Sequence, residues 1–489
     1  MRLALVLISG LVALSASAAS AWPPASPLLP PDHWAVRAAE RLHEVGLAPG
    51  WLPAQRAAPL WVVGQALTDA AERAEREAQP WAPLAQAWAA RFAVEFPRAL
   101  RAEPSLRLAG ASVGLGAQFG HVQEPRPVAP PPWFVPLTAP GDAAVAEASA
   151  AALLGEHLAA GARLKASTWD LDVPSAELVG ALGPLMLTVG RGPVGYGPNE
   201  MGAVVASGAV PLDRVELLTS VPVRVPGLEV LGDFAFDTAL AGFWDDEARH
   251  PYHPLLWEFQ LQWRPHPRLT LGGIRGVMFG GKNWEGIPAH DVPLSLLGIK
   301  NFNENNVYSV SAKFRLPTEP LLPLTAKVEW GSDDNPGAAA QWPGLVAGLS
   351  APMLGGLPAA LGVEYAYFGR GPVGYHDPFG WYTHGQYTGG WVTRQTPLGD
   401  PMGGNGKALR LTGAADLWDA RVRLSGVGFV QDRSRDNLYA PSAVGRSVGG
   451  RGDAELRIDR WAFAVRGGYE HGEQGWSRGD VTAVVSAFF

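Results

Sequence analysis

The stretch LWEFQLQW, residues 256–263, alternates apolar and polar side chains with a period of two. Its apolar positions are Trp257, Phe259, Leu261 and Trp263, and its polar positions are Glu258, Gln260 and Gln262. Successive side chains of an extended strand point to opposite faces, so this pattern predicts a β-strand with one apolar and one polar face.

The same alternation recurs along the chain, in Val307–Leu316, Leu324–Trp330, Leu409–Leu417, Ala454–Asp459 and Val481–Phe489. Segments of about ten residues with this pattern are typical of membrane-spanning barrel strands. A soluble β-sandwich or barrel also alternates, but it turns its apolar face inward. The 19 Trp, 17 Phe and 10 Tyr residues of the chain favour the membrane barrel. The last segment ends on Phe489 and resembles the C-terminal signal of bacterial outer-membrane barrels.

The first 21 residues have the features of a secretory signal peptide. Arg2 provides the positive charge, Leu3–Leu14 the apolar segment, and Ala19–Ala21 the small residues of a cleavage site. The chain contains no Cys, which excludes disulfides, thiolate metal sites and Cys nucleophiles. No later segment approaches twenty uninterrupted apolar residues, so a transmembrane helix is not expected.

Residues 22–100 are predicted to form a small helical domain in the periplasm. Asp32 is expected to cap the first helix, a second helix to span Leu60–Gln79, and a third to carry an aromatic stripe from Trp81 to Phe96. We expect that stripe to pack against the other helices. The opening segment DHWAVRAAERLHEVGL, residues 32–47, resembles the start of an S-layer-homology repeat over barely one repeat.

Residues 101–489 are predicted to form the barrel, with about 18 antiparallel strands. Short turns are expected at 265–267, 317–323, 418–419 and 459–460, and outer loops at 280–306, 331–344, 431–449 and 471–478. The two strand counts, from either end of the barrel, agree only if Gly369–Gly406 leaves and returns on the same side. The same argument makes Gly190–Leu212 a single outer excursion. The fold prediction is therefore an all-β membrane barrel with a small N-terminal helical domain.

Several short motifs suggest enzymes but lack the structural context that those enzymes need. The heptapeptide GRGPVGY occurs at 190–196 and again at 369–375, and it contains G-x-G-x-x-G. A dinucleotide site needs a helix after this motif, and neither YGPNEMG nor YHDPFGW can begin one. His250 and His253 lack the spacing of metal ligands. The net charge of −7 argues against nucleic acid. We predict no catalysis, no cofactor and no metal.

Four blocks of sequence resemble the capsule assembly protein Wzi family of outer-membrane barrels. They are GRGPVGYGPNEMGAVVASGAVPL (190–212), GIRGVMFGGKN (273–283), NENNVYSVSAKFRLP (303–317) and YTHGQYTGGWVTRQTPLGDPMGGNGKAL (382–409). The family usually has Trp-Gly-Pro where this chain has Tyr196-Gly197-Pro198. The resemblance implies an eighteen-stranded barrel with a helical periplasmic start. It also implies a lectin-like role in holding capsular or other extracellular polysaccharide.

The residues after each repeated heptapeptide support a sugar site on chemical grounds. Aromatic faces stack on sugar rings, and amide, carboxylate, imidazole and guanidinium groups bond to hydroxyls. The predicted polysaccharide-binding residues are Tyr196, Asn199, Tyr375, His376, Asp377, Trp381, Tyr382, His384, Tyr387, Trp391 and Arg394. The competing interpretation is that these aromatics fill the lumen as a plug or form a girdle.

The function predicted from the sequence is a monomeric outer-membrane barrel of a diderm bacterium, in contact with lipid, that binds surface polysaccharide for capsule assembly or attachment. The alternative is a porin or sugar-uptake channel tethered through its N-terminal domain.

Overall fold

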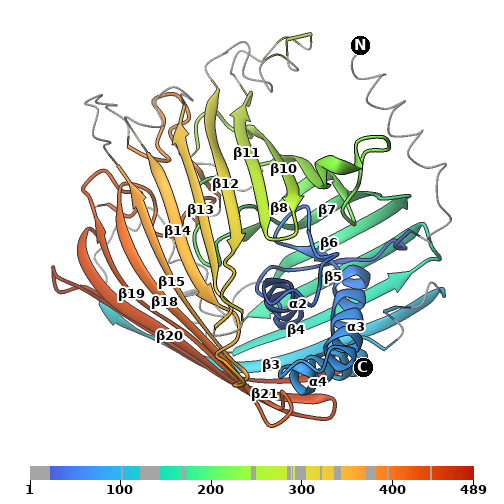
Figure 1. The fold of residues 1–489 in the computed structure, drawn as a ribbon. Helices are drawn as coiled ribbons and strands as arrows, with labels where there is room; N and C mark the ends of the chain where they lie inside the picture. The colour runs from blue at the N-terminus through green and yellow to red at the C-terminus, as the bar shows by residue number, and fades with distance from the viewer. Residues whose placement is uncertain are drawn as a thin grey trace.

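The computed structural model consists of a ring of strands with three helices inside it (Figure 1). It describes residues 22–97, 99–100, 103–121, 144–167, 171–243, 249–282, 288, 290–291, 294, 304–319, 322–334, 343–369, 380–393, 396–440 and 443–489. The predicted signal peptide lies outside the described residues. Among them, no helix is long and apolar enough to span a membrane.

Eighteen antiparallel strands form one closed barrel. Every strand pairs with the barrel strands that precede and follow it in the chain, and the last strand, β22, closes the barrel by pairing with the first, β3. The strands are β3 (Ser105–His121), β4 (Ala144–Leu153), β5 (Leu158–Ser167), β6 (Leu171–Leu182), β7 (Leu185–Gly195), β8 (Ser207–Thr219), β9 (Asp233–Gly242), β10 (Leu255–His266), β11 (Leu269–Phe279), β12 (Asn305–Arg315), β13 (Thr325–Asp333), β14 (Gly344–Ala351), β15 (Ala359–Phe368), β18 (Gly406–Leu417), β19 (Val422–Arg433), β20 (Gly445–Ile458), β21 (Trp461–Gly472) and β22 (Ser477–Phe488). The predicted strand number is confirmed.

The barrel wall turns its apolar side chains outward, as predicted for a membrane barrel. In β10, Leu261 is 41% exposed on the outer face, whereas Glu258 and Gln260 are buried on the lumen side. Outside, Phe234 of β9 stacks on Trp263 with ring centroids 6.4 Å apart. A soluble barrel would show the opposite arrangement, so that alternative is wrong.

Short connections gather at one end of the barrel, which we call the short-turn end, and long ones at the other, the long-loop end. The predicted turns lie at the short-turn end, where residues 267–268, 316–324, 418–421 and 459–460 join successive strands. Residues 369–405 leave β15 and return as β18 beside it, as the strand count required. One boundary was wrong: Gly190–Gly195 continues β7, with a register shift between Pro193 and Gly195, and the excursion comprises only residues 196–206.

The N-terminal helices form a small core of their own. They are α2 (Trp34–Glu44), α3 (Leu60–Arg76) and α4 (Ala82–Glu95), with the short strands β1 (Leu28–Leu29) and β2 (Ala58–Pro59) pairing beside them. Trp88 and Phe92 are buried against Leu42 and Leu67, which confirms the packing role of the aromatic stripe. The predicted N-cap residue of α2, Asp32, was wrong by one position: the N-cap is His33, whose side chain accepts the backbone N–H of Ala35.

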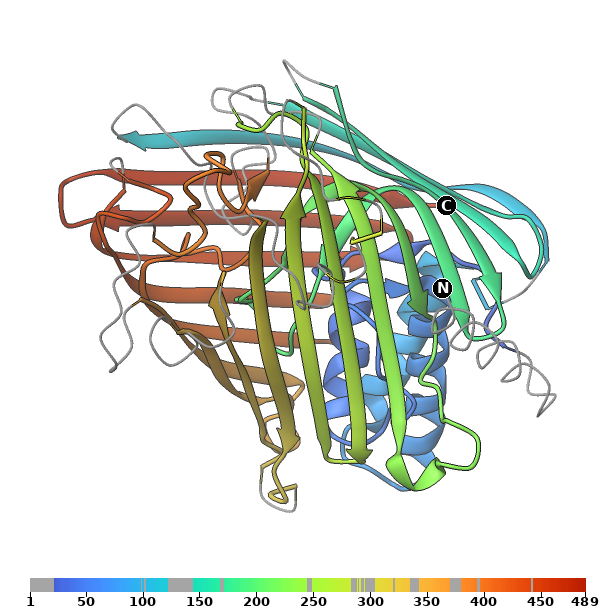
Figure 2. The same cartoon turned by 90° about the horizontal axis from the view of Figure 1, so that it is seen from above.

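This helical domain lies inside the barrel toward the short-turn end (Figure 2), and charged pairs hold it to the wall. Glu44 accepts from Lys327 at 2.6 Å, Arg41 donates to Asp416 at 2.8 Å, and Glu95 accepts from Arg457 at 2.6 Å. Burial raises the pKa of Glu95, but the hydrogen bond and charge of His33 and the charges of Arg91 and Arg457 outweigh it and lower that pKa to about 2. Burial lowers the pKa of His43 to about 3, so this imidazole is neutral at physiological pH.

Candidate functional site

Two excursions from the long-loop end fold into the lumen and contact each other. They are residues 196–206, between β7 and β8, and residues 380–405, before β18; together we call them the cap. The cap is closed by direct bonds: the Tyr382 hydroxyl donates to the carbonyl of Val204 at 2.7 Å, and the Trp391 indole donates to that of Val205 at 2.8 Å. The backbone N–H of Ser207 donates to Leu398 at 2.7 Å.

Residues 196–206 cross the lumen without a neighbouring strand, so side chains of the barrel wall satisfy their backbone groups. Glu364 of β15 accepts the N–H groups of Met201 and Gly202 at 3.1 and 2.7 Å. Glu329 of β13 accepts the N–H of Val204 at 3.1 Å. Buried backbone donors require such partners, which explains why acidic residues stand on the lumen face of these strands.

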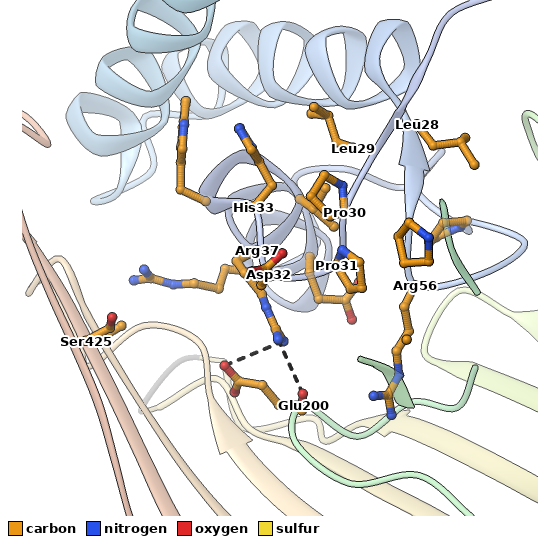
Figure 3. A pocket seen from close by; sticks show the side chains of 18 of the residues that line it. Leu28, Leu29, Pro30, Pro31, Asp32, His33, Arg37, Arg56, Glu200 and Ser425 are labelled. Carbon is orange, nitrogen blue, oxygen red and sulfur yellow. Dashed lines mark hydrogen bonds and ion pairs between the residues drawn. The ribbon is translucent and has the colours of Figure 1, made fainter. Parts of the chain in front are cut away.

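The N-terminal domain contacts the same segment from the other side (Figure 3). Arg56 donates to the carbonyls of Gly197, Gly202 and Ser207, and burial lowers its pKa to about 10. Arg37 donates to the carbonyl of Glu200 at 3.3 Å and pairs with its carboxylate at 3.6 Å. Residues 196–206 are therefore held between the helical domain and the rest of the cap.

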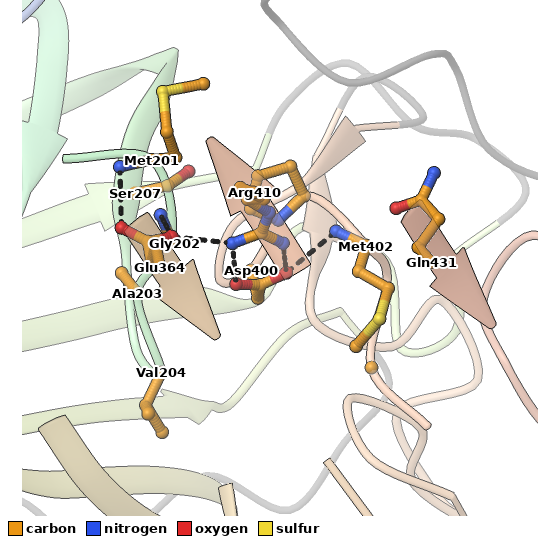
Figure 4. Close-up of polar contacts among 12 residues, drawn as sticks. Met201, Gly202, Ala203, Val204, Ser207, Glu364, Asp400, Met402, Arg410 and Gln431 are labelled. Atoms are coloured by element: carbon orange, nitrogen blue, oxygen red, sulfur yellow. Dashed lines mark hydrogen bonds and ion pairs between the residues drawn. The ribbon is translucent and has the colours of Figure 1, made fainter. Parts of the chain in front are cut away.

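A buried charge cluster fixes the cap to the wall (Figure 4). The guanidinium of Arg410, on β18 and 1% exposed, donates to Glu364 at 2.7 Å and to the two carboxylate oxygens of Asp400 at 2.5 and 3.0 Å. Asp400 also accepts the N–H of Met402 at 2.9 Å. One arginine thus connects both excursions, because Glu364 binds 196–206 and Asp400 belongs to 380–405.

The aromatic side chains of the cap are packed within it. The ring of Trp381 meets that of Phe368 edge to face with centroids 5.0 Å apart, and the backbone N–H of Trp381 donates to the side-chain oxygen of Asn405 at 3.0 Å. Burial raises the pKa of Tyr382 well above its ordinary value, and that of Tyr196 likewise. The Tyr196 hydroxyl donates to Asp237 of β9 at 2.7 Å.

Polar side chains lie at the solvent-facing edge of the cap. The Nδ1 atom of His384 accepts the N–H groups of Gln386 and Tyr387 at 3.1 and 3.2 Å, and its Nε2 lies 3.7 Å from Asp334. The hydroxyl of Tyr387 donates to the carbonyl of Gly280 at 3.4 Å. His384 and Gln386 are both partly exposed, and the side chain of His384 is 13% exposed.

A neighbouring loop extends this edge. The carbonyl of His250 accepts from Thr388 at 2.9 Å, and that of Tyr252 accepts from Lys282 at 2.6 Å. Tyr252 is 42% exposed. His250, Tyr252, Lys282, His384 and Gln386 form a patch that we call the rim. The predicted binding residues did not include Tyr252, and only its aromatic ring in a Pro- and His-rich segment could have indicated it.

Seven of the eleven predicted binding residues can be placed. Six are buried within the cap or where it meets the wall, and His384 is at the rim: the six are Tyr196, Asn199, Trp381, Tyr382, Tyr387 and Trp391. Tyr375, His376, Asp377 and Arg394 lie outside the described residues. Among the residues that the structure describes, no three His, Asp or Glu side chains are grouped to hold a metal ion.

Comparison with known proteins gives one family and a set of similar barrels. The family model "Capsule assembly protein Wzi" matches residues 139–475. Wzi of Escherichia coli, described as a carbohydrate-binding outer-membrane barrel involved in group 1 capsule assembly, superposes with a TM-score of 0.72 at 15% identity, covering 95% of this chain and 100% of that one. OpdL of Pseudomonas aeruginosa has a TM-score of 0.50 at 12% identity, over 79% and 99% of the two chains. No curated protein sequence matches.

Proposed function

The chain belongs to the capsule assembly protein Wzi family, and from that membership we propose that it is an outer-membrane barrel that binds capsular or other extracellular polysaccharide at the cell surface. The similar barrel from Escherichia coli is described as binding carbohydrate, which supports the same class of ligand here.

The exposed surface supports the membrane location. Large apolar side chains cover the outer face of the strands, among them Leu187, Leu240, Leu261, Val310 and Leu411. Closure of the barrel pairs the backbone of every strand, as a lipid environment requires. Barrels of this kind have short turns in the periplasm and long loops outside. By that rule we propose that the N-terminal domain lies at the periplasmic end of the lumen and that the rim faces the cell exterior.

The observation that carries the proposal is the cap. A pre-organised surface loses little conformational entropy when a flexible polymer binds to it. Here the buried aromatics and the Arg410 cluster hold the cap in one arrangement, and the rim presents an aromatic ring, imidazoles, an amide and an ammonium group. These groups offer stacking and hydrogen bonds to sugar rings. We assign direct contact to the rim, including His384, and support of the surface to the six buried residues.

The arrangement favours binding over transport. A general channel needs an open lumen, and residues 196–206 cross the lumen between the helical domain and residues 380–405.

The test is polysaccharide binding by cells that produce the protein, with Tyr252→Ala and Gln386→Ala as the variants. Loss of one stacking contact or one hydrogen bond costs about 1–2 kcal/mol, so each variant is expected to bind about five- to thirtyfold more weakly. Tyr469→Ala is the matched control, because Tyr469 is similarly exposed but stacks on Phe119 on the lipid-facing wall. Unchanged binding in both rim variants would contradict the proposal.

A further inference from the structure

A cavity lined by polar and charged side chains lies inside the barrel, on the side of residues 196–206 that faces away from the rim. It is a partly open cavity of about 930 Å³ between the N-terminal domain and the lumen wall (Figure 3). Small-molecule sites commonly occupy about 300–1,000 Å³, so this cavity has the size of a binding site. Its wall consists largely of small residues, including Ser112, Ala148, Gly161, Ser425 and Ala464, which leave the space unfilled.

Arg423 of β19 is one of the residues that line this cavity. The residues directly opposite it on the neighbouring strands are Asp416 of β18 and Glu455 of β20. The N-terminal domain takes both carboxylates: Arg41 donates to Asp416 at 2.8 Å, and Arg91 donates to Glu455 at 2.5 Å. Within the described part of the chain, the side chain of Arg423 makes no hydrogen bond or ion pair.

The docked helical domain therefore creates a local excess of positive charge. Arg91 also lies 3.9 Å from Glu95, which pairs with Arg457 at 2.6 Å. The four guanidinium groups of Arg41, Arg91, Arg423 and Arg457 therefore face the three carboxylates of Asp416, Glu455 and Glu95. Other basic groups that line the cavity have acidic partners: Arg163 pairs with Glu147 at 3.0 Å within the wall, and Lys327 pairs with Glu44 of the helical domain at 2.6 Å. A guanidinium fork binds a carboxylate through two parallel hydrogen bonds, so Arg423 is suited to an oxyanion.

We propose that this cavity is a lumenal binding site for a short acidic oligosaccharide, with the sugar carboxylate on Arg423 and the ring hydroxyls on Ser425 and the neighbouring polar wall. The excess of guanidinium groups indicates that the ligand is an anion, whereas the inference that this anion is a sugar rests on the proposed function. Docking of the N-terminal domain completes the site, because it diverts the two carboxylates that would otherwise neutralise Arg423.

The test is isothermal titration of the purified full chain in detergent with trigalacturonate, and with maltotriose as the neutral probe. One saturable site is expected for trigalacturonate, with at least tenfold tighter binding than for maltotriose. Arg423→Gln should lower the affinity for trigalacturonate at least tenfold. Arg423→Lys keeps the charge but loses the fork, so its loss should be smaller. Arg421→Gln is the control, because Arg421 lies two residues away in the exposed turn.

Equal binding of trigalacturonate to the native chain and the Arg423→Gln variant would overturn the proposal, as would equal affinity for the two trimers. Inorganic phosphate is a further probe: displacement of the trimer by phosphate at a similar concentration would indicate an adventitious anion site only. Polysaccharide binding by cells is measured in parallel. If the native protein does not bind trigalacturonate but the cells still bind the polysaccharide, only the lumenal site is rejected. If cells that produce the native protein do not bind the polysaccharide, the proposed function is rejected.

Discussion

Replacing Arg410 by Met is expected to release the cap from the barrel wall. The side chain is buried between Glu364 and Asp400, and Met keeps much of its volume without its charge. Removing one partner of a buried ion pair costs about 3–5 kcal/mol, because the remaining carboxylates stay buried without compensation. A tenfold change in equilibrium corresponds to about 1.4 kcal/mol, so local opening of the cap should become about 10²- to 10⁴-fold more frequent.

Native-state hydrogen exchange measures this opening directly. The amides of Met201 and Gly202, which donate to Glu364, and of Met402, which donates to Asp400, should exchange faster by that factor. Amides in the strands should keep their protection, since β15 and β18 remain paired with their other neighbours. In planar bilayers, the opened cap should give brief conductance events that the native chain lacks.

Two further variants separate this reasoning from general damage to the barrel. Arg466→Met removes a partly exposed arginine that lies 3.3 Å from Asp453, and a solvated pair of this kind is worth at most about 1 kcal/mol. Combining Arg410→Met with Glu364→Gln and Asp400→Asn removes all three charges and should restore much of the protection. Native-like exchange at Met201 and Met402 in the single Arg410 variant would refute the role of the cluster.

Three other predictions concern the helical domain and one strand. The pKa of His43 is about 3 in the folded domain and about 6.5 in the unfolded domain, so the unfolded domain binds more protons between these pH values and the folded domain should lose stability as the pH falls from about 6.5 to about 3. In acid titrations followed by circular dichroism, His43→Gln should reduce this dependence of stability on pH. His266→Gln, at an exposed position, should leave it unchanged. Trp88→Ala should destabilise the helical core by about 3–5 kcal/mol, measured as a lower midpoint of the helical signal on heating. Gly190→Val should prevent pairing of β6 with β7, because the φ of +136° suits glycine and an added Cβ would overlap the carbonyl oxygen of Ala176; the expected result is loss of the heat-modifiable band in electrophoresis.

The sequence predicted the barrel well because its wall is repetitive. Each strand separates a lipid-facing from a lumen-facing set, as Leu261 and Gln260 do, and this alternation is visible in any single strand. The connections could be counted because every outgoing strand must be followed by a returning one. The repeated heptapeptide was harder: its glycines and prolines suggested turns, but in β7 they remain paired with β8 up to Gly195, with a register shift between Pro193 and Gly195. Gly190 adopts its positive φ inside the strand, not in a turn.

Whether an aromatic loop points outward to ligand or inward to the lumen could not be predicted from that loop alone. Tyr382 and Trp391 suit either place, since each has an apolar ring and one polar atom. The informative residues lie elsewhere in the chain, on the strands that face the loop. A segment that crosses a lumen without a strand beside it leaves backbone donors that the wall must satisfy, and Glu329 and Glu364 do so for residues 196–206. Acidic residues at lumen-facing positions, such as Glu329 of β13 and Glu364 of β15, are therefore the sequence feature that predicts an inward fold, and the strands that carry them show where the loop crosses.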